Sequence, residues 1–196
     1  MHGLINRSLE NFIRCTYGDA LWAAVMDDLD CGFDSFEPMF VYEDGLTRQV
    51  LDLLSARLDK PRAALLEDLG TFLVTDESTE SVRRLLRFGG VDYEDFLHSL
   101  DDLPGRARLA VADLHLPELE LLDQGEGDFT LRVNTSLPGF GLVFLGVLRA
   151  MADDYGALAL LQYMGPSGED EVISIRLLDA GFQEGRSFDL AVGAEA

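Results

Sequence analysis

The sequence predicts an α+β fold, in which a helical N-terminal part precedes a mainly antiparallel sheet of about four strands with one inserted helix. Before about residue 117, apolar residues recur at helical spacing. After that point apolar and polar residues alternate, which is typical of half-buried strands. Helices and strands are thus segregated along the chain, and this segregation argues against a parallel doubly wound sheet.

The predicted helices follow from their apolar stripes and their end signals. On the first, we place Leu9 and Phe12 on the buried face and Glu10 on the opposite, solvent face. Proline or glycine marks several of the ends. The expected boundaries are a helix over residues 4–17, a helix from Asp19, a loop over residues 30–45, a helix from Thr47 to Lys60, a helix from Pro61, a helix capped by Ser78 or Thr79, and a helix after Gly90 that stops at Pro104-Gly105.

The second half is predicted from its alternation and its turns. A hairpin is expected around Gln124–Gly127, because glycine-rich segments between alternating runs form turns. The elements that we expect are strands around Leu119–Leu121 and Phe129–Val133, a strongly apolar helix over residues 140–155, strands over residues 157–164 and 171–178, and a short edge piece within residues 182–196.

The chain is expected to form one domain over residues 1–182, followed by a C-terminal tail over residues 183–196. Residues 1–60 would be its N-terminal helical part, and residues 61–182 would carry the other helices and the sheet. The length of 196 residues allows one substantial core, and the hydrophobic content of 47% argues against disorder. We find no internal repeat and no low-complexity linker.

Charge excludes some classes of function. The chain has 36 acidic and 15 basic side chains, which gives a net charge of -21. Such a surface repels the phosphates of nucleic acids and anionic membranes. No apolar stretch is long enough for a membrane span. The two cysteines make neither a disulfide framework nor a metal-binding spacing, so we expect a reduced, cytoplasmic protein.

Several short motifs, each weak alone, stand in an informative order. They are the start Met1-His-Gly-Leu-Ile-Asn-Arg7, the segment Leu66-Glu-Asp-Leu-Gly70 with Phe72, the series Phe96-Leu97…Leu100-Asp101…Leu103, Pro117, and Gly139-Phe140…Gly146. Together they resemble the haem nitric oxide/oxygen binding (H-NOX) family over roughly residues 1–180. This family supplies the sensor domain of soluble guanylate cyclases and of bacterial gas sensors.

The resemblance implies a haem pocket, but the residues that hold haem in the family are missing here. The position of the family's proximal histidine is occupied by Pro104, which has no donor for iron. The positions of its Tyr-x-Ser-x-Arg motif, which holds the propionates, are Val133, Thr135 and Leu137. Pro117 matches the family proline that presses on the haem. We therefore expect haem to be absent or bound in a different way.

Other residues are weaker candidates for a substitute iron ligand. His98 lies six residues before the family's ligand position, which turns it by about 240° away from the pocket. His115, in a loop, could swing inward, although a solvated loop histidine is the simpler interpretation. We interpret His2 as a surface residue at the frayed start of the first helix. Cys15 and Cys31 could bind iron as thiolates, but buried cysteines commonly serve as core.

Three hypotheses for function follow. The first is a regulatory domain that has lost the usual haem ligation and signals by contacting a partner; the resemblance implies a histidine kinase or a cyclic-di-nucleotide enzyme, since no output domain lies in this chain. The second is a haem-binding gas sensor with a substitute ligand, or a binder of another apolar small molecule. The third is an enzyme, which we do not expect because no nucleophile and base form a recognisable constellation.

Overall fold

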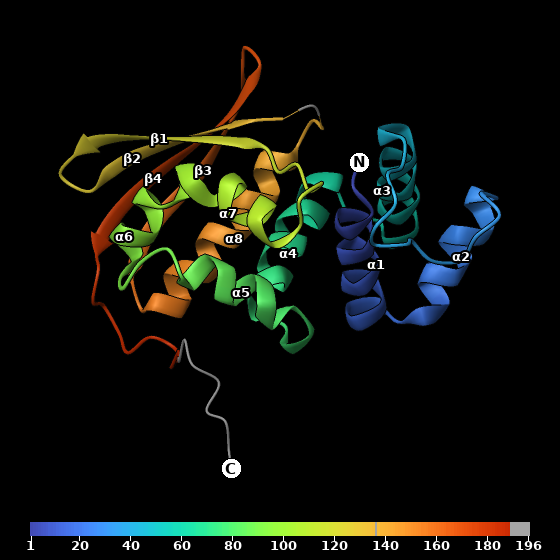
Figure 1. Ribbon diagram of the computed structural model, residues 1–196, viewed down its shortest axis with the longest axis horizontal. Coiled ribbons are helices and arrows are strands. Elements are labelled where there is room, and N and C mark those ends of the chain that lie inside the picture. Colours follow the sequence, from blue (N-terminus) through green and yellow to red (C-terminus); the bar gives the residue numbers. More distant parts are fainter. Residues whose placement is uncertain (136, 189–196) are drawn as a thin grey trace.

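The computed structural model describes residues 1–135 and 137–188, which form eight α-helices and four strands. Helices α1 to α3 stand together at one end of the molecule, and the sheet with the other helices forms the rest (Figure 1). The α+β class predicted from the sequence is confirmed. The elements are α1 (Gly3–Tyr17), α2 (Asp19–Leu29), α3 (Asp44–Leu58), α4 (Arg62–Thr75), α5 (Glu80–Arg87), α6 (Tyr93–His98), α7 (Leu103–Ala110), β1 (Glu118–Gly125), β2 (Asp128–Asn134), α8 (Phe140–Tyr155), β3 (Leu158–Ser167) and β4 (Asp170–Asp179), with short 3-10 turns at Glu77–Thr79 and Leu100–Asp102.

The four strands form one antiparallel sheet in the order β1-β2-β4-β3. Alternate side chains face the helices, so that Phe129, Leu131 and Val133 of β2 are buried, as are Ile173 and Ile175 of β4. All the helices that neighbour the sheet lie on this inner side (Figure 1). The outer side carries the intervening residues of each strand.

Helix α8 crosses the inner side of the sheet and packs against α4. The two helices approach closely because glycines stand at their contact. A Cβ atom added to Gly70 would overlap the carbonyl oxygen of Val143, and one added to Gly146 would overlap that of Glu67. Neither position leaves room for a side chain. The close packing of the two helices therefore explains why each motif has a glycine there. Helix α4 also contacts α1 and α3, so it joins the N-terminal helices to the sheet.

The position of Glu10 differs from the prediction for the first helix. Its side chain is buried, although the polar pattern places it on the solvent face. Its carboxylate accepts hydrogen bonds from Arg14 Nε at 2.9 Å and from the backbone N–H of Phe36 at 3.0 Å. Phe36 belongs to the segment between α2 and α3, which folds back over α1. A partner that is distant in sequence therefore overrides the local polar pattern.

Pro104 also corrects a prediction. We expected it to end a helix, but it lies in the first turn of α7, which continues to Ala110. The preceding helix, α6, ends at His98, and a 3-10 turn joins the two. Proline suits a first turn, because the backbone N–H that it lacks would have no partner within the helix there.

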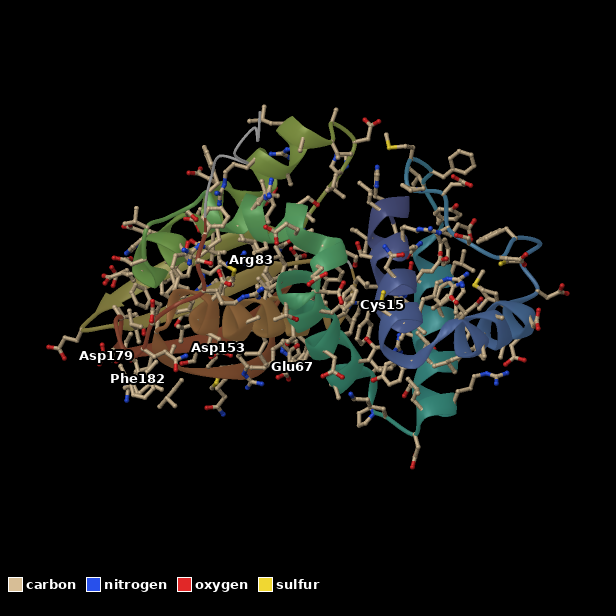
Figure 2. All side chains as sticks on the ribbon, turned by 90° about the horizontal axis from the view of Figure 1, so that it is seen from below. Cys15, Glu67, Arg83, Asp153, Asp179 and Phe182 are labelled. Atoms are coloured by element: carbon tan, nitrogen blue, oxygen red, sulfur yellow. The ribbon has the colours of Figure 1, made fainter. Side chains whose placement is uncertain are left out.

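The chain beyond β4 forms no strand within the part that the structure describes, so the predicted edge piece is absent up to residue 188; the remainder of that prediction, residues 189–196, lies outside the described residues. Residues 183–188 instead run along α5 and α8. Arg83 donates to Asp154 at 2.9 Å and to the carbonyl oxygen of Ser187 at 3.1 Å. Both Arg83 and Asp154 are buried, and Figure 2 shows Arg83 close to α8.

Candidate ligand-binding site

The inner positions of the expected pocket are apolar and closed. Val133 has 0% of its surface exposed, Leu137 has 3%, and Pro104 is also buried. A side chain that lines a cavity wide enough for water keeps accessible surface, so protein atoms surround Val133 on all sides. The donors that haem would need, an imidazole for iron and a phenol and a guanidinium for propionates, are not present at these three positions.

Thr135 and Pro117 lie nearer the surface, and each is half-buried. The hydroxyl of Thr135 accepts a hydrogen bond from the backbone N–H of Leu137 at 3.1 Å. This local bond fixes the turn after β2, because a threonine hydroxyl commonly bonds the backbone two residues further on. The one polar side chain of the altered propionate motif thus already has a partner within its own turn.

Glu171 is a buried carboxylate that sequence reasoning missed. It lies on β4 directly opposite Val133 and is 7% exposed. It accepts hydrogen bonds from the backbone N–H groups of Gly139 and of Gly141, the latter at 2.6 Å. These donors belong to the start of α8, where the helix dipole favours an anion. Only the tertiary pairing of β4 with α8 reveals this arrangement.

The neighbourhood of Glu171 disfavours a second anion. Burial, followed by the nearby Glu171 carboxylate, raises the pKa of Tyr163 to about 12. A haem propionate beside Val133 would meet the same negative carboxylate in a region of low dielectric constant. The residues present therefore do not fit the family's way of holding haem.

A cleft opens at the rim of this closed region. It has a volume of about 400 Å³ and lies between the start of α1, the loop before β1 and the end of β2. Ile5, Pro117 and Phe140 supply its apolar side. Its polar side contains two histidines and three carboxylates, namely His2, His115, Asp44, Asp113 and Glu118. The volume falls within the range of small-molecule sites.

The two histidines of this rim cleft differ in their surroundings. His2 is only 6% exposed, which corrects the expectation of a surface residue, because it pairs with Val41 in an isolated bridge. Its Nδ1 accepts the backbone N–H of Leu4 at 3.2 Å and caps α1. His115 is exposed, and its Nδ1 lies 2.9 Å from the carbonyl oxygen of Asp113. A proton on Nδ1 would leave its Nε2 free to bind a ligand.

The structure places the remaining candidate ligands outside the cleft. His98 is about half exposed, with its Nε2 3.7 Å from Asp123 and its ring 5.6 Å from that of Phe129. Cys15 is exposed on α1, far from the sheet (Figure 2), and Cys31 is half-buried. Neither cysteine is therefore a fully buried core residue. Within residues 1–135 and 137–188, no three His, Cys, Asp or Glu side chains gather in a way that could hold a metal ion.

The fold and the position of the altered pocket define a class of protein. In this class, a sensor domain, helices and a four-stranded sheet surround a cofactor pocket. The family model described as "Haem-NO-binding" matches residues 2–159, so this chain belongs to the haem-NO-binding (H-NOX) family. Members of this family sense NO or O2 in general through haem. No helix among the described residues has the length and apolarity needed to cross a membrane.

Solved structures agree on the fold. An H-NOX protein from S. oneidensis in the Fe(II)NO ligation state superposes with a TM-score of 0.78 at 14% identity, covering 91% of this chain and 100% of that one. A mutant H-NOX protein from K. algicida, in the Fe(II) unliganded state, gives a TM-score of 0.77 at 17% identity, covering 93% of this chain and 99% of that one.

Curated relatives are soluble guanylate cyclases. Soluble guanylate cyclase 89Da of Drosophila melanogaster is 22% identical over 170 residues, covering 87% of this chain and 26% of the relative. Soluble guanylate cyclase gcy-34 of Caenorhabditis elegans is 26% identical over 157 residues, covering 78% of this chain and 23% of the relative. The chain thus spans about a quarter of the length of the curated relatives it matches.

Proposed function

We propose that this H-NOX domain has lost the family's usual haem ligation and acts as a regulatory domain by contacting a partner protein. We take residues 1–182 as the domain and place it in the cytoplasm, in accord with its unpaired cysteines. The observation that carries the proposal is that Pro104, Val133 and Leu137, which the resemblance assigns to the family's iron- and propionate-binding positions, are all buried and apolar.

The changes at the family's iron-binding position and at its propionate-binding positions weaken haem binding in two independent ways. The iron-binding position has lost its imidazole, and the propionate-binding face has lost its cation while Glu171 stands beside it. Loss of one ligand alone would leave the other contacts to retain haem. Loss of both would remove the coordinate bond and the ion pairing, and Val133 and Leu137 leave almost no accessible surface at these positions.

The output is proposed to come from another protein or another part of a longer chain. Family members commonly work with signalling proteins, and the resemblance implies a histidine kinase or a cyclic-di-nucleotide enzyme as the partner. The relatives above are named as guanylate cyclases, which makes a cyclase a further candidate output. We assign no catalytic activity to this domain itself, since its carboxylates and histidines form no nucleophile–base pair that we can identify among the described residues.

Haemin titration of the purified protein tests the loss of ligation. We expect a broad absorption band that grows with added haemin without saturating, as it does for haemin in buffer. A sharp Soret band that saturates at a one-to-one ratio of haemin to protein would contradict the proposal. The Pro104→His variant is the informative companion, because it restores the imidazole at the family's position and should sharpen the band.

A second candidate, haem binding through a substitute ligand, is favoured by one observation. His115 lies on a cleft of about 400 Å³, next to the family proline Pro117, and its Nε2 is free to bind iron if Nδ1 carries the proton. The same titration with His115→Ala tests this candidate, with His98→Ala as the matched control outside the cleft. A saturable band that only His115→Ala abolishes would establish it, and an unchanged band would remove His115.

A further inference from the structure

The rim cleft carries uncompensated negative charge. None of the described residues that line it is a lysine or an arginine. Met1 also lines the cleft, but its amino group donates to the carboxylate of Asp44 and to the carbonyl oxygen of Tyr42, both at 2.6 Å. The carboxylates of Asp113 and Glu118 have no cationic partner in the part of the chain that the structure describes. This cleft therefore attracts a positively charged group.

His115 adds a hydrogen-bond acceptor to the wall formed by Asp113 and Glu118. Its Nδ1 lies 2.9 Å from the carbonyl oxygen of Asp113, and because a carbonyl oxygen only accepts, the ring proton belongs on Nδ1. The Nε2 of the neutral ring is then an acceptor. Among residues 1–135 and 137–188, such groups are not gathered closely enough to hold a metal ion. An organic cation, which needs a negative field and no closed coordination shell, fits this wall better.

His2 supplies a hydrogen-bond donor at the wall formed by the start of α1. It lines the cleft and is only 6% exposed. Its Nδ1 accepts the backbone N–H of Leu4 at 3.2 Å, so the ring carries its proton on Nε2. This Nε2–H has no acceptor among the described residues. Because an unpaired donor at a buried position costs free energy, an oxygen atom of a ligand would stabilise it.

An apolar surface lies between the two polar walls. Ile5, Leu116 and Pro117 are half-buried, and Phe140 is 7% exposed. These side chains offer a surface against which a ring or a branched hydrocarbon group can pack. The volume of about 400 Å³ is that of a small-molecule site.

We propose that the rim cleft binds a small organic amine that is cationic at neutral pH and carries an apolar ring and a neutral oxygen. The ammonium group faces Asp113 and Glu118, and the ring packs against Phe140. The oxygen accepts the Nε2–H of His2. A neutral oxygen fits better than a carboxylate, since Asp44 lies on the same side of the cleft. The net charge of -21 raises the local concentration of such cations.

This inference goes beyond the proposed function and uses only residues of the rim. The family's haem-binding positions, Pro104, Val133 and Leu137, have no part in it. The absorption spectrum of the sample used for amine binding reports its haem content separately. A sharp Soret band would contradict the proposed loss of haem ligation, whereas failure to bind the amine contradicts the present inference.

Isothermal titration calorimetry of the purified chain with tyramine tests the proposal, because tyramine has an ammonium group, a ring and a hydroxyl group at the far end. We expect one site with a Kd on the order of 10 to 100 µM. Phenethylamine lacks the hydroxyl group and should bind about 2- to 10-fold more weakly. In 4-hydroxyphenylacetate a carboxylate replaces the ammonium group, and we expect no measurable binding.

Variants of the acidic wall locate the site. Asp113→Asn and Glu118→Gln should each weaken tyramine binding by about 2- to 5-fold, because both carboxylates are exposed and water screens part of their attraction. The matched control is Asp27→Asn, which removes the same charge from an exposed position of α2 outside the cleft and should leave the Kd unchanged. Circular dichroism of each variant checks that the exposed substitutions leave the fold intact.

Four outcomes would overturn the proposal. They are no heat of binding up to about 1 mM tyramine, equal binding of 4-hydroxyphenylacetate, and a Kd that neither Asp113→Asn nor Glu118→Gln changes. The fourth is equal weakening by Asp27→Asn, which would mean that net charge and not the cleft attracts the amine. Equal Kd values for tyramine and phenethylamine would contradict the role of His2 and, with it, the class of ligand proposed.

Discussion

The closed interior of the pocket and the cleft at its rim meet near the end of β2, where Val133 belongs to the interior and Asn134 and Thr135 line the cleft, yet their chemistry differs. The interior is formed by Val133, Leu137 and Pro104, which are buried and apolar. The rim contains His2 and His115 together with several carboxylates. The difference teaches that one framework can enclose an apolar core at these interior positions and present polar groups at the rim. If haem ligation is lost, as we propose, ligand recognition would use the rim.

The largest effect should come from placing a charge in the interior. Val133→Asp is expected to lower the free energy of unfolding by more than about 4 kcal/mol at neutral pH, because a carboxylate without solvent would stand opposite Glu171. The matched control is Thr135→Asp, two residues further on in the turn after β2, at the half-buried rim, where a far smaller loss is expected. Urea unfolding measures both.

The pH dependence of this penalty sharpens the comparison. Burial would raise the pKa of the new carboxyl above its value in the unfolded chain, so the folded form is favoured when the group is protonated. The deficit of the Val133→Asp variant relative to the unchanged protein should therefore shrink as pH falls from 7 toward about 4. An equal deficit at both pH values would mean that the interior is hydrated.

A cavity in the interior should have the next largest effect. Leu137→Ala removes a side chain that is 3% exposed and should cost about 2 to 5 kcal/mol. Leu109→Ala makes the same chemical change at a site that is 90% exposed, and there we expect less than about 0.5 kcal/mol. Similar losses for the two variants would show that Leu137 lies beside an open pocket.

Tyr163 links the interior to alkaline stability. Burial, together with Glu171, raises the pKa of Tyr163 to about 12, above the ordinary value of 10.0. A group whose pKa is higher in the folded protein stabilises it below the unfolded pKa, and this contribution is lost as pH rises through the folded pKa. Stability should thus fall between pH 10 and about 12, and less steeply in Tyr163→Phe. An unchanged slope would contradict this account.

The rim should tolerate substitution best. His115→Ala, at an exposed position, should change stability by less than about 0.5 kcal/mol. His2→Ala should cost about 0.5 to 2 kcal/mol, because it removes the cap of α1. Thermal unfolding compares the two variants. A large loss in His115→Ala would mean that the rim cleft is part of the core.

Periodicity predicts most of the fold because the signals are local. The stripe of α1, the alternation of β2 and the glycine-bounded helix α8 each follow from residues close together in the sequence. The prediction for Pro104 was wrong because the same residue can end one helix or begin the next. The 3-10 turn that decides between the two has no signature in the local pattern.

The site was harder to predict because its contacts are distant in sequence. Glu10 and His2 were expected at the surface, and the segment between α2 and α3 covers both of them. Glu171 follows a turn and looks like an ordinary polar strand residue, yet it caps α8, some thirty residues earlier. The assignment of Pro104, Val133 and Leu137 to the family's haem-binding positions rests on the family resemblance alone and stays a prediction, while their burial required the structure.

The central claim is that this H-NOX domain has lost the family's haem ligation. The most direct test is the haem content of protein produced in cells supplied with a haem precursor, measured by the pyridine haemochrome assay against protein concentration. The account predicts a haem content far below one haem per chain, rising in Pro104→His. A content close to one haem per chain in the unchanged protein, with a sharp Soret band, would contradict it.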